Sequence, residues 1–311
     1  MMHTLMVREH NDVATRLAKL NPLWDKERVF QETRRIVAAM IQHITYNEFL
    51  PRGLGTRQLE QYEVDLQTSG YYNGYRPYCS DIIFNEFSTA AFRFGHSLIR
   101  SNFTLMSEED METGSGMDLP LRDVFANPEF IRSGVDIDNL VRGIVMTPME
   151  EMDNKITEDV ANHLFEFKNK KFSGLDLAAL NIQRGRDHGI PGYNKYRQMC
   201  GLLEASDFTH LTEIPFEFRL KLAKVYRNPN DIDLFTGLLI EEKLPGAIVG
   251  PTLACLLGKQ FRNLRQCDRL VNIFRIFYFH IVTRLTLVSR FWYENGDLLT
   301  RFSPGQLQEI R

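Results

Sequence analysis

Several classes of functional motif are absent from these 311 residues. The chain has no Walker loop, no dinucleotide-binding glycine motif, no nucleophile elbow and no paired-cysteine zinc spacing. It also lacks a block of lysine and arginine, and its formal net charge is −3, which argues against a nucleic-acid or anionic-membrane partner. The pair Asp187-His188 is not matched by a serine or cysteine in a hydrolase motif. These absences argue against nucleotide-dependent enzymes, hydrolases with a serine or cysteine nucleophile, and zinc proteins.

Cysteine is scarce, with four residues in the chain: Cys79, Cys200, Cys255 and Cys267. That count does not distinguish a reducing from an oxidising compartment. The triplet Asn102-Phe103-Thr104 is an N-glycosylation acceptor sequence, which fits a secreted protein but is common by chance. No secretory leader is visible, because the first residues lead directly into a charged amphipathic segment. The residues alone therefore leave the location open.

The spacing of apolar residues favours helices, and no clear strand alternation is evident. Asp25 is placed to cap a long helix. Residues 53–79 and 101–127 have the composition of irregular structure or loops. We therefore predict one mainly α domain over residues 1–311. Its helices are expected at residues 3–20, 25–50, 88–100, 136–142, 156–167, 175–183, 193–200, 215–227 and 251–261.

One candidate site lies in the segment Phe92-Arg-Phe-Gly-His-Ser-Leu-Ile99, where His96 stands among apolar residues beside Gly95. A glycine inside a helix costs about 1 kcal/mol relative to alanine, so we expect the space a Cβ would fill to serve another purpose. A flat cofactor lying against the helix would use that space, with His96 as the axial ligand of its iron. A core histidine bonded to a backbone carbonyl is the alternative, and this segment alone leaves both open.

A second stretch, Asp176-Leu-Ala-Ala-Leu-Asn-Ile-Gln-Arg-Gly-Arg-Asp-His-Gly-Ile-Pro-Gly-Tyr-Asn194, adds to the first. Together the two stretches resemble the animal haem peroxidase family, which includes myeloperoxidase, chorion peroxidase and peroxinectin-like proteins. The resemblance implies a helical peroxidase-like fold and a haem b cofactor. It also implies hydrogen peroxide as substrate, with phenolic compounds or halides as the donors that are oxidised.

The resemblance assigns roles to four residues of this chain. His96 would be the proximal ligand of the haem iron, and Asn181 would be its hydrogen-bond partner, because a ligating imidazole needs its other nitrogen held. Arg93 and Arg184 would face the haem propionates, with a surface ion pair as the alternative for each. Arg93 precedes His96 by three residues, so both side chains project to the same side of a helix.

The resemblance also bears on the cysteines. The family joins cysteines at the positions of Cys200 and Cys255, so we predict that disulfide, an oxidising compartment and a secreted, extracellular protein. Cys79 and Cys267 stay open between free thiols, a bond to each other, and bonds to segments outside this sequence.

The resemblance corresponds to only the C-terminal half or so of a full catalytic domain. Peroxide chemistry also needs a distal base and a distal cation. In the family these residues and the calcium-binding loop precede the stretch where this chain begins. The motif Arg8-Glu-His-Asn11 is better explained as an ion-paired helix face. We therefore assign no catalytic residue and no calcium site, and we expect weak turnover or none.

A non-catalytic adhesion or matrix protein on the same scaffold is the alternative function. The oligomeric state is left open by the sequence. A third hypothesis, attachment to a membrane, rests only on the apolar residues 270–289, which are long enough for a span. Arg275, His280 and Arg284 interrupt that stretch and make a span costly, so we expect no membrane anchor.

The same stretch divides a family motif. Cys267-Asp-Arg269 and Phe291-Trp-Tyr-Glu-Asn295 resemble its two halves, with residues 270–290 as an anomalous apolar insert between them. We hypothesise that this insert is a retained, in-frame intron, which sequencing of the mature transcript would test.

Overall fold

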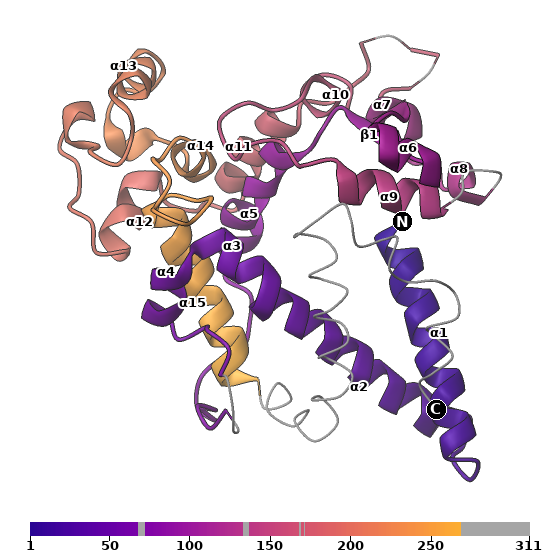
Figure 1. Cartoon of the computed structure of the whole chain (residues 1–311). Coiled ribbons are helices and arrows are strands. Elements are labelled where there is room, and N and C mark those ends of the chain that lie inside the picture. Colours follow the sequence, from indigo (N-terminus) through magenta and orange to yellow (C-terminus); the bar gives the residue numbers. More distant parts are fainter. Residues whose placement is uncertain (68–71, 133–136, 168, 171, 269–311) are drawn as a thin grey trace.

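Helices make up nearly all the regular structure in the part of the chain that this computed structural model describes, residues 1–67, 72–132, 137–167, 169–170 and 172–268 (Figure 1). The prediction of a mainly α fold is therefore confirmed. One antiparallel pair of strands interrupts the helices, β1 (Asn102–Leu105) and β2 (Met117–Pro120), in a region predicted to be a loop. Each strand has four residues and so two side chains on each face, too few to show alternation in the sequence.

Two long helices begin the chain, α1 (Met2–Leu20) and α2 (Lys26–Ile44). Asp25 caps α2 as predicted, because its side chain accepts a hydrogen bond from the backbone N–H of Arg28 at 2.7 Å. The helix then continues through a π-helical turn, η1 (Thr45–Phe49), into α3 (Leu50–Leu54). No residue of α1 is buried, and Figure 1 shows α1 beside α2 and away from α12–α15.

The core is organised around α15 (Pro251–Cys267), in which 12 of 17 residues are buried. Helices α3, α4 (Thr56–Gln61) and α5 (Asn85–Thr89) pack against it. The absence of a side chain at Gly258 permits this packing, since a Cβ there would lie 2.2 Å from a ring carbon of Tyr62. The ring of Phe261 contacts four other rings, those of Tyr46, Phe49, Phe87 and Phe92. This aromatic cluster supports the segment that carries His96.

Shorter elements surround the core. The helices predicted near residues 136, 175, 193 and 215 are present with ends shifted by a few residues. The helix predicted at residues 156–167 is wrong beyond its first turn, because Leu164 instead pairs with Leu175 in an isolated antiparallel bridge. The elements are α6 (Glu108–Thr113), α7 (Leu121–Val124), α8 (Glu129–Arg132), α9 (Ile137–Met146), α10 (Glu158–Ala161), α11 (Leu177–Asp187), α12 (Tyr193–Met199), η3 (Phe208–His210), α13 (Phe216–Val225), η4 (Pro229–Asp231) and α14 (Leu234–Leu239).

Two disulfides join segments that are distant in the sequence. The predicted bond between Cys200 and Cys255 is present and ties the end of α12 to the first turns of α15. Cys79 bonds to Cys267 at the other end of α15, which resolves the alternatives left open for these two residues. Both ends of the central helix are therefore held covalently.

The apolar insert at residues 270–290, with its proposed origin as an intron, lies outside the described residues. The membrane attachment that rested on this stretch is likewise not addressed by the structure. Among the helices that are described, none combines the length and the apolar character that a membrane crossing requires.

Candidate functional site

The segment around His96 is helical, but not in the form that was predicted. A continuous helix over residues 88–100 is wrong, because α5 ends at Thr89 and the backbone turns at Ala90, with φ −138° and ψ −59°. A 3₁₀ helix, η2 (Ala91–Leu98), then follows. Its buried residues, Ala91, Phe94 and Ser97, recur every third position, which matches the three residues per turn of a 3₁₀ helix.

The same three-residue repeat aligns Arg93 with His96. In a 3₁₀ helix, side chains three apart lie directly above one another, so these two project together more closely than they would from an α-helix. Sequence reasoning expected both on one side, and the structure places them so. The ideal Cβ position of Gly95 has no atom within 4 Å, and the neighbouring Phe92 is 45% exposed. The space that Gly95 leaves is therefore open to a flat ligand.

Asn181 reaches this segment from α11. The helix starts at Asp176, whose carboxylate accepts from the N–H of Ala179 at 3.0 Å, and Asn181 is fully buried. The Nδ2 atom of Asn181 lies 2.8 Å from Nδ1 of His96, and its Oδ1 accepts from Nη1 of Arg93 at 3.1 Å. The sequence predicted that Asn181 pairs with His96 but did not predict the hydrogen bond from Arg93 to Asn181. The three-residue spacing of Arg93 and His96 is the only signal of that bond in the sequence.

His96 is held in the neutral form that metal ligation needs. Burial lowers the pKa of its imidazole, and the positive charge of Arg93 lowers it further, while the hydrogen bond from Asn181 acts in the opposite direction. Within the described part of the chain, Nε2 of His96 has no hydrogen-bond partner. The ring therefore offers one free nitrogen, and its orientation is set through the other.

The two arginines of the site lie close enough to influence each other. Burial lowers the pKa of Arg93, and the charge of Arg184 on α11 lowers it further. Among the described residues, neither arginine forms an ion pair with a carboxylate, and Arg184 is exposed. Two neighbouring cations without an acidic partner make a binding place for a ligand with carboxylate groups.

Comparison with known proteins places this chain in a family. The model of the family described as animal haem peroxidase matches residues 1–311. This chain is a member of the animal haem peroxidase family. It is 42% identical to a human peroxidasin homolog over 314 residues, covering 100% of this chain and 19% of that protein. It is 38% identical to the chorion peroxidase of Drosophila melanogaster over 310 residues, covering 100% of this chain and 35% of that protein.

Solved structures agree with the sequence comparison. Peroxidase A from Dictyostelium discoideum superimposes with a TM-score of 0.74 at 34% identity, over 91% of this chain and 51% of that one. The expected peroxidase-like helical fold is therefore confirmed. The chain spans about half of this solved structure and between about a fifth and a third of the two curated relatives.

Membership in a haem peroxidase family implies a haem cofactor, and the donor set of this chain fits one. Among the described residues, no three His, Cys, Asp or Glu side chains gather into a metal-binding group. A haem iron needs only an axial ligand from the protein, because the porphyrin supplies the other donors. A single histidine with one free nitrogen, open space beside it and unpaired arginines nearby meets that need.

Other polar residues of the second motif have structural partners in this member of the family. Arg186 forms two hydrogen bonds with Asp233, at 2.8 and 2.6 Å, so it is not available as Arg184 is. Asp187 accepts from Gln183, and Nδ1 of His188 lies 2.8 Å from Oδ1 of Asn85. Asp187 and His188 therefore bond to other groups, which removes the basis of a hydrolase site.

A cavity of about 280 Å³ beside Asn181 is small for a macrocycle.

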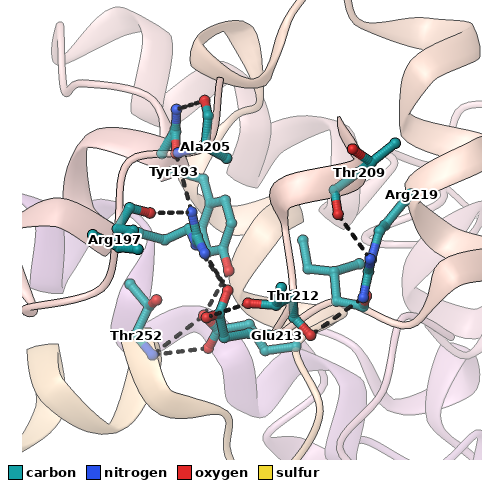
Figure 2. A network of polar contacts seen from close by, with 12 residues as sticks. Tyr193, Arg197, Ala205, Thr209, Thr212, Glu213, Arg219 and Thr252 are labelled. Carbon is teal, nitrogen blue, oxygen red and sulfur yellow. Dashed lines mark hydrogen bonds and ion pairs between the residues drawn. The ribbon is translucent and has the colours of Figure 1, made fainter. Parts of the chain in front are cut away.

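A second polar cluster includes Tyr193 and Arg197 of α12, Thr252 at the start of α15, and Glu213 (Figure 2). Arg197 on α12 is 1% exposed, forms an ion pair with Glu213, and donates to the carbonyl of Leu203 at 2.7 Å. Next to it, Glu241 accepts from the hydroxyl of Tyr193 at 2.7 Å and from the backbone N–H of Thr252 at 3.0 Å. This cluster was not predicted, because its members come from segments far apart in the sequence.

Proposed function

We propose that this chain binds haem b through His96 and is part of an enzyme that uses hydrogen peroxide to oxidise phenolic donors or halides. The observation that carries the proposal is the 2.8 Å contact between Nδ1 of His96 and the buried amide of Asn181. Nε2 has no hydrogen-bond partner among the described residues, and the neighbouring Gly95 leaves open space. Haem supplies the redox chemistry of such an enzyme when it is bound.

The residues of the site have distinct tasks in this proposal. His96 gives the axial ligand, and Asn181 fixes the direction of its ring. Arg93 and Arg184 hold the two propionates of haem b by charge-assisted hydrogen bonds. Phe92, which is exposed, and Gly95, which leaves open space, would give the macrocycle room beside His96. The lowered pKa of His96 keeps its nitrogen free of a second proton at neutral pH.

No residue of this chain is assigned as distal base or distal cation. His10, for which the sequence predicted no distal role, lies on α1, where its ring contacts that of Phe30 on α2. We therefore propose that residues 1–311 turn over slowly or not at all without further residues that move a proton between the peroxide oxygens. The alternative, a non-catalytic adhesion or matrix protein that keeps the scaffold, predicts haem binding without turnover.

We further propose that the protein is secreted. Its four cysteines form two disulfides in the structure, and such bonds persist in oxidising compartments.

The first prediction tests the axial ligand. Haem-free chain titrated with haem should develop an absorbance band with a defined stoichiometry, and His96→Ala should weaken that binding by more than about a hundredfold. Loss of an outer partner alone costs about ten- to a hundredfold, and the direct ligand should cost more.

His210→Ala is the matched control for that titration, because His210 is exposed and, among the described residues, pairs with groups on its own short segment. Equal affinity of haem for the His96 and His210 variants would contradict the proposal. A guaiacol oxidation assay on the loaded chain then measures its turnover, and rapid oxidation would contradict both the slow turnover proposed above and the non-catalytic alternative.

A further inference from the structure

The orientation of the Asn181 amide follows from the chemistry of Arg93. A guanidinium carries only donors, so the atom of Asn181 that faces Arg93 at 3.1 Å must be the carbonyl oxygen. The NH₂ group then faces Nδ1 of His96 at 2.8 Å and donates to it. In this arrangement Nδ1 is an acceptor, and the single proton of the neutral imidazole lies on Nε2.

Ligation of a metal through Nε2 requires the opposite arrangement. Nε2 must then present its lone pair, so the proton of the neutral ring moves to Nδ1. An Nδ1–H would face the NH₂ group of Asn181, which brings two donors together. The amide must therefore turn by about half a revolution so that its oxygen faces His96. The oxygen and the NH₂ group are nearly the same size, so Asn181 can turn without disturbing its buried surroundings.

The turn of the amide has a consequence for Arg93. After the turn, the NH₂ group of Asn181 faces the guanidinium, and these are again two donors. Arg93 must then leave Asn181 for another acceptor. Its other side-chain hydrogen bond among the described residues is to the carbonyl of Ser88, at 3.0 Å, so neutral groups alone hold it. A carboxylate would compete well, because charge-assisted hydrogen bonds are about twice as strong as neutral ones.

We propose that Arg93 is a latch on Asn181: it holds the amide in the orientation that opposes ligation by His96, and it releases the amide when a carboxylate of the incoming haem captures it. This inference rests on the proposed function. It gives Arg93 a positioning role that acts through Asn181, in addition to holding a propionate. It also makes the carboxylates of haem the signal that readies His96.

The test compares haem with its dimethyl ester, which has no free carboxylates. Each is titrated into the haem-free 311-residue chain, and the dissociation constant is read from absorbance. The ester should bind the unaltered chain weakly, since it cannot release the latch. Arg93→Ala should bind the ester roughly tenfold more tightly than the unaltered chain does, because a hydrogen bond that opposes ligation has been removed.

Arg186→Ala is the matched control, because it removes an arginine from the helix of Asn181 that is paired with Asp233 and has no role in the proposed haem site. A latch predicts that Arg186→Ala leaves ester binding unchanged. If Arg93 serves only as an ion-pair partner, Arg93→Ala should leave ester binding unchanged as well, and that result would overturn the latch.

Asn181→Asp gives a second comparison. A carboxylate accepts from Arg93 and from Nδ1–H of His96 at once, so no turn is needed. Adding Arg93→Ala to Asn181→Asp should therefore give no gain in ester binding. A gain as large as in the chain that retains Asn181 would show that Arg93 acts by another route.

A measurement on the haem-free protein tests the latch without any ligand. Nitrogen NMR of chain labelled in histidine should place the His96 proton on Nε2, and Arg93→Ala should shift population toward Nδ1–H. A proton on Nδ1 in the unaltered chain would overturn the inference. If neither haem nor its ester binds, the proposed function fails, and the NMR result still decides whether the latch exists.

Discussion

The two polar clusters of this molecule each contain a titratable side chain whose pKa is shifted by burial, but they differ in how completely the polar atoms of that side chain are bonded. Glu241 is buried, and burial raises its pKa to about 7, a shift that often marks a catalytic acid. Its carboxylate nevertheless accepts from Tyr193 and from backbone N–H groups at the first turn of α15, where a negative charge also suits the helix dipole. The cluster around Glu241 therefore holds the start of the central helix.

The cluster around His96 differs in what it leaves unused. Asn181 contacts Nδ1 of the imidazole and accepts from Arg93, while Nε2 has no hydrogen-bond partner among the described residues. A Cβ at the neighbouring Gly95 would meet no atom within 4 Å. The comparison teaches that a shifted pKa alone does not identify a functional group, because the shifted carboxylate of Glu241 is bonded to groups that hold a helix. Changes in the cluster around Glu241 should alter the stability of the fold, whereas changes in the cluster around His96 should alter haem binding.

The largest stability effect is expected at Arg197. Arg197→Ala leaves Glu213 and the Leu203 carbonyl without their partner, and breaking a buried ion pair typically costs about 3–5 kcal/mol. Arg186→Ala is the control, because that arginine is 58% exposed on its side chain and should cost less than about 1 kcal/mol. Urea unfolding measures both free energies. In both variants the affinity of the folded molecules for haem should stay unchanged. A large loss of haem affinity in Arg197→Ala would show that the two clusters are coupled.

The next effect concerns pH. The pKa of Glu241 is raised from its ordinary value of 4.5 to about 7 in the folded chain. Between these two pH values the folded chain therefore binds more protons than the unfolded chain. Stability from this group is therefore full below pH 4.5 and declines as pH rises toward 7. The decline is at most about 3 kcal/mol, since each pH unit in that window costs about 1.4 kcal/mol.

Glu241→Gln should remove this slope, while Glu217→Gln, at an exposed position, should keep it. Unfolding free energies at intervals between pH 4.5 and 7.5 give the comparison. Parallel curves for Glu241→Gln and the unaltered chain would mean that Glu241 keeps its charge throughout.

The smallest effects come from a pair of glycines. A Cβ at Gly250 would lie 2.2 Å from the Cβ of Glu241, so Gly250→Ala should cost about 1–3 kcal/mol of folding stability. A Cβ at Gly95 meets no atom within 4 Å, so Gly95→Ala should not destabilise the haem-free chain and should raise its stability by up to about 1 kcal/mol. Its methyl group should instead weaken haem binding, as measured by titration. Unchanged haem affinity in Gly95→Ala would place the macrocycle elsewhere.

Local patterns predicted much of the fold, with instructive failures. The cap at Asp25 and most helix positions were predicted, because they depend on residues three or four apart. The helix through His96 was predicted as one piece, whereas the backbone turns at Ala90 and continues as a 3₁₀ helix. The strands escaped detection because pairing with a partner, and not their own four residues, gives them their form.

The amino-acid sequence by itself determined the family and brought His96 and Asn181 together as a pair, because two long motifs with fixed internal spacing carry that information. Only the tertiary structure decided which groups surround the pair. The bond from Arg93 to Asn181 spans 88 positions, and the disulfide from Cys79 to Cys267 spans 188. Contacts over such separations depend on how α5, α11 and α15 pack, and no local periodicity encodes that packing.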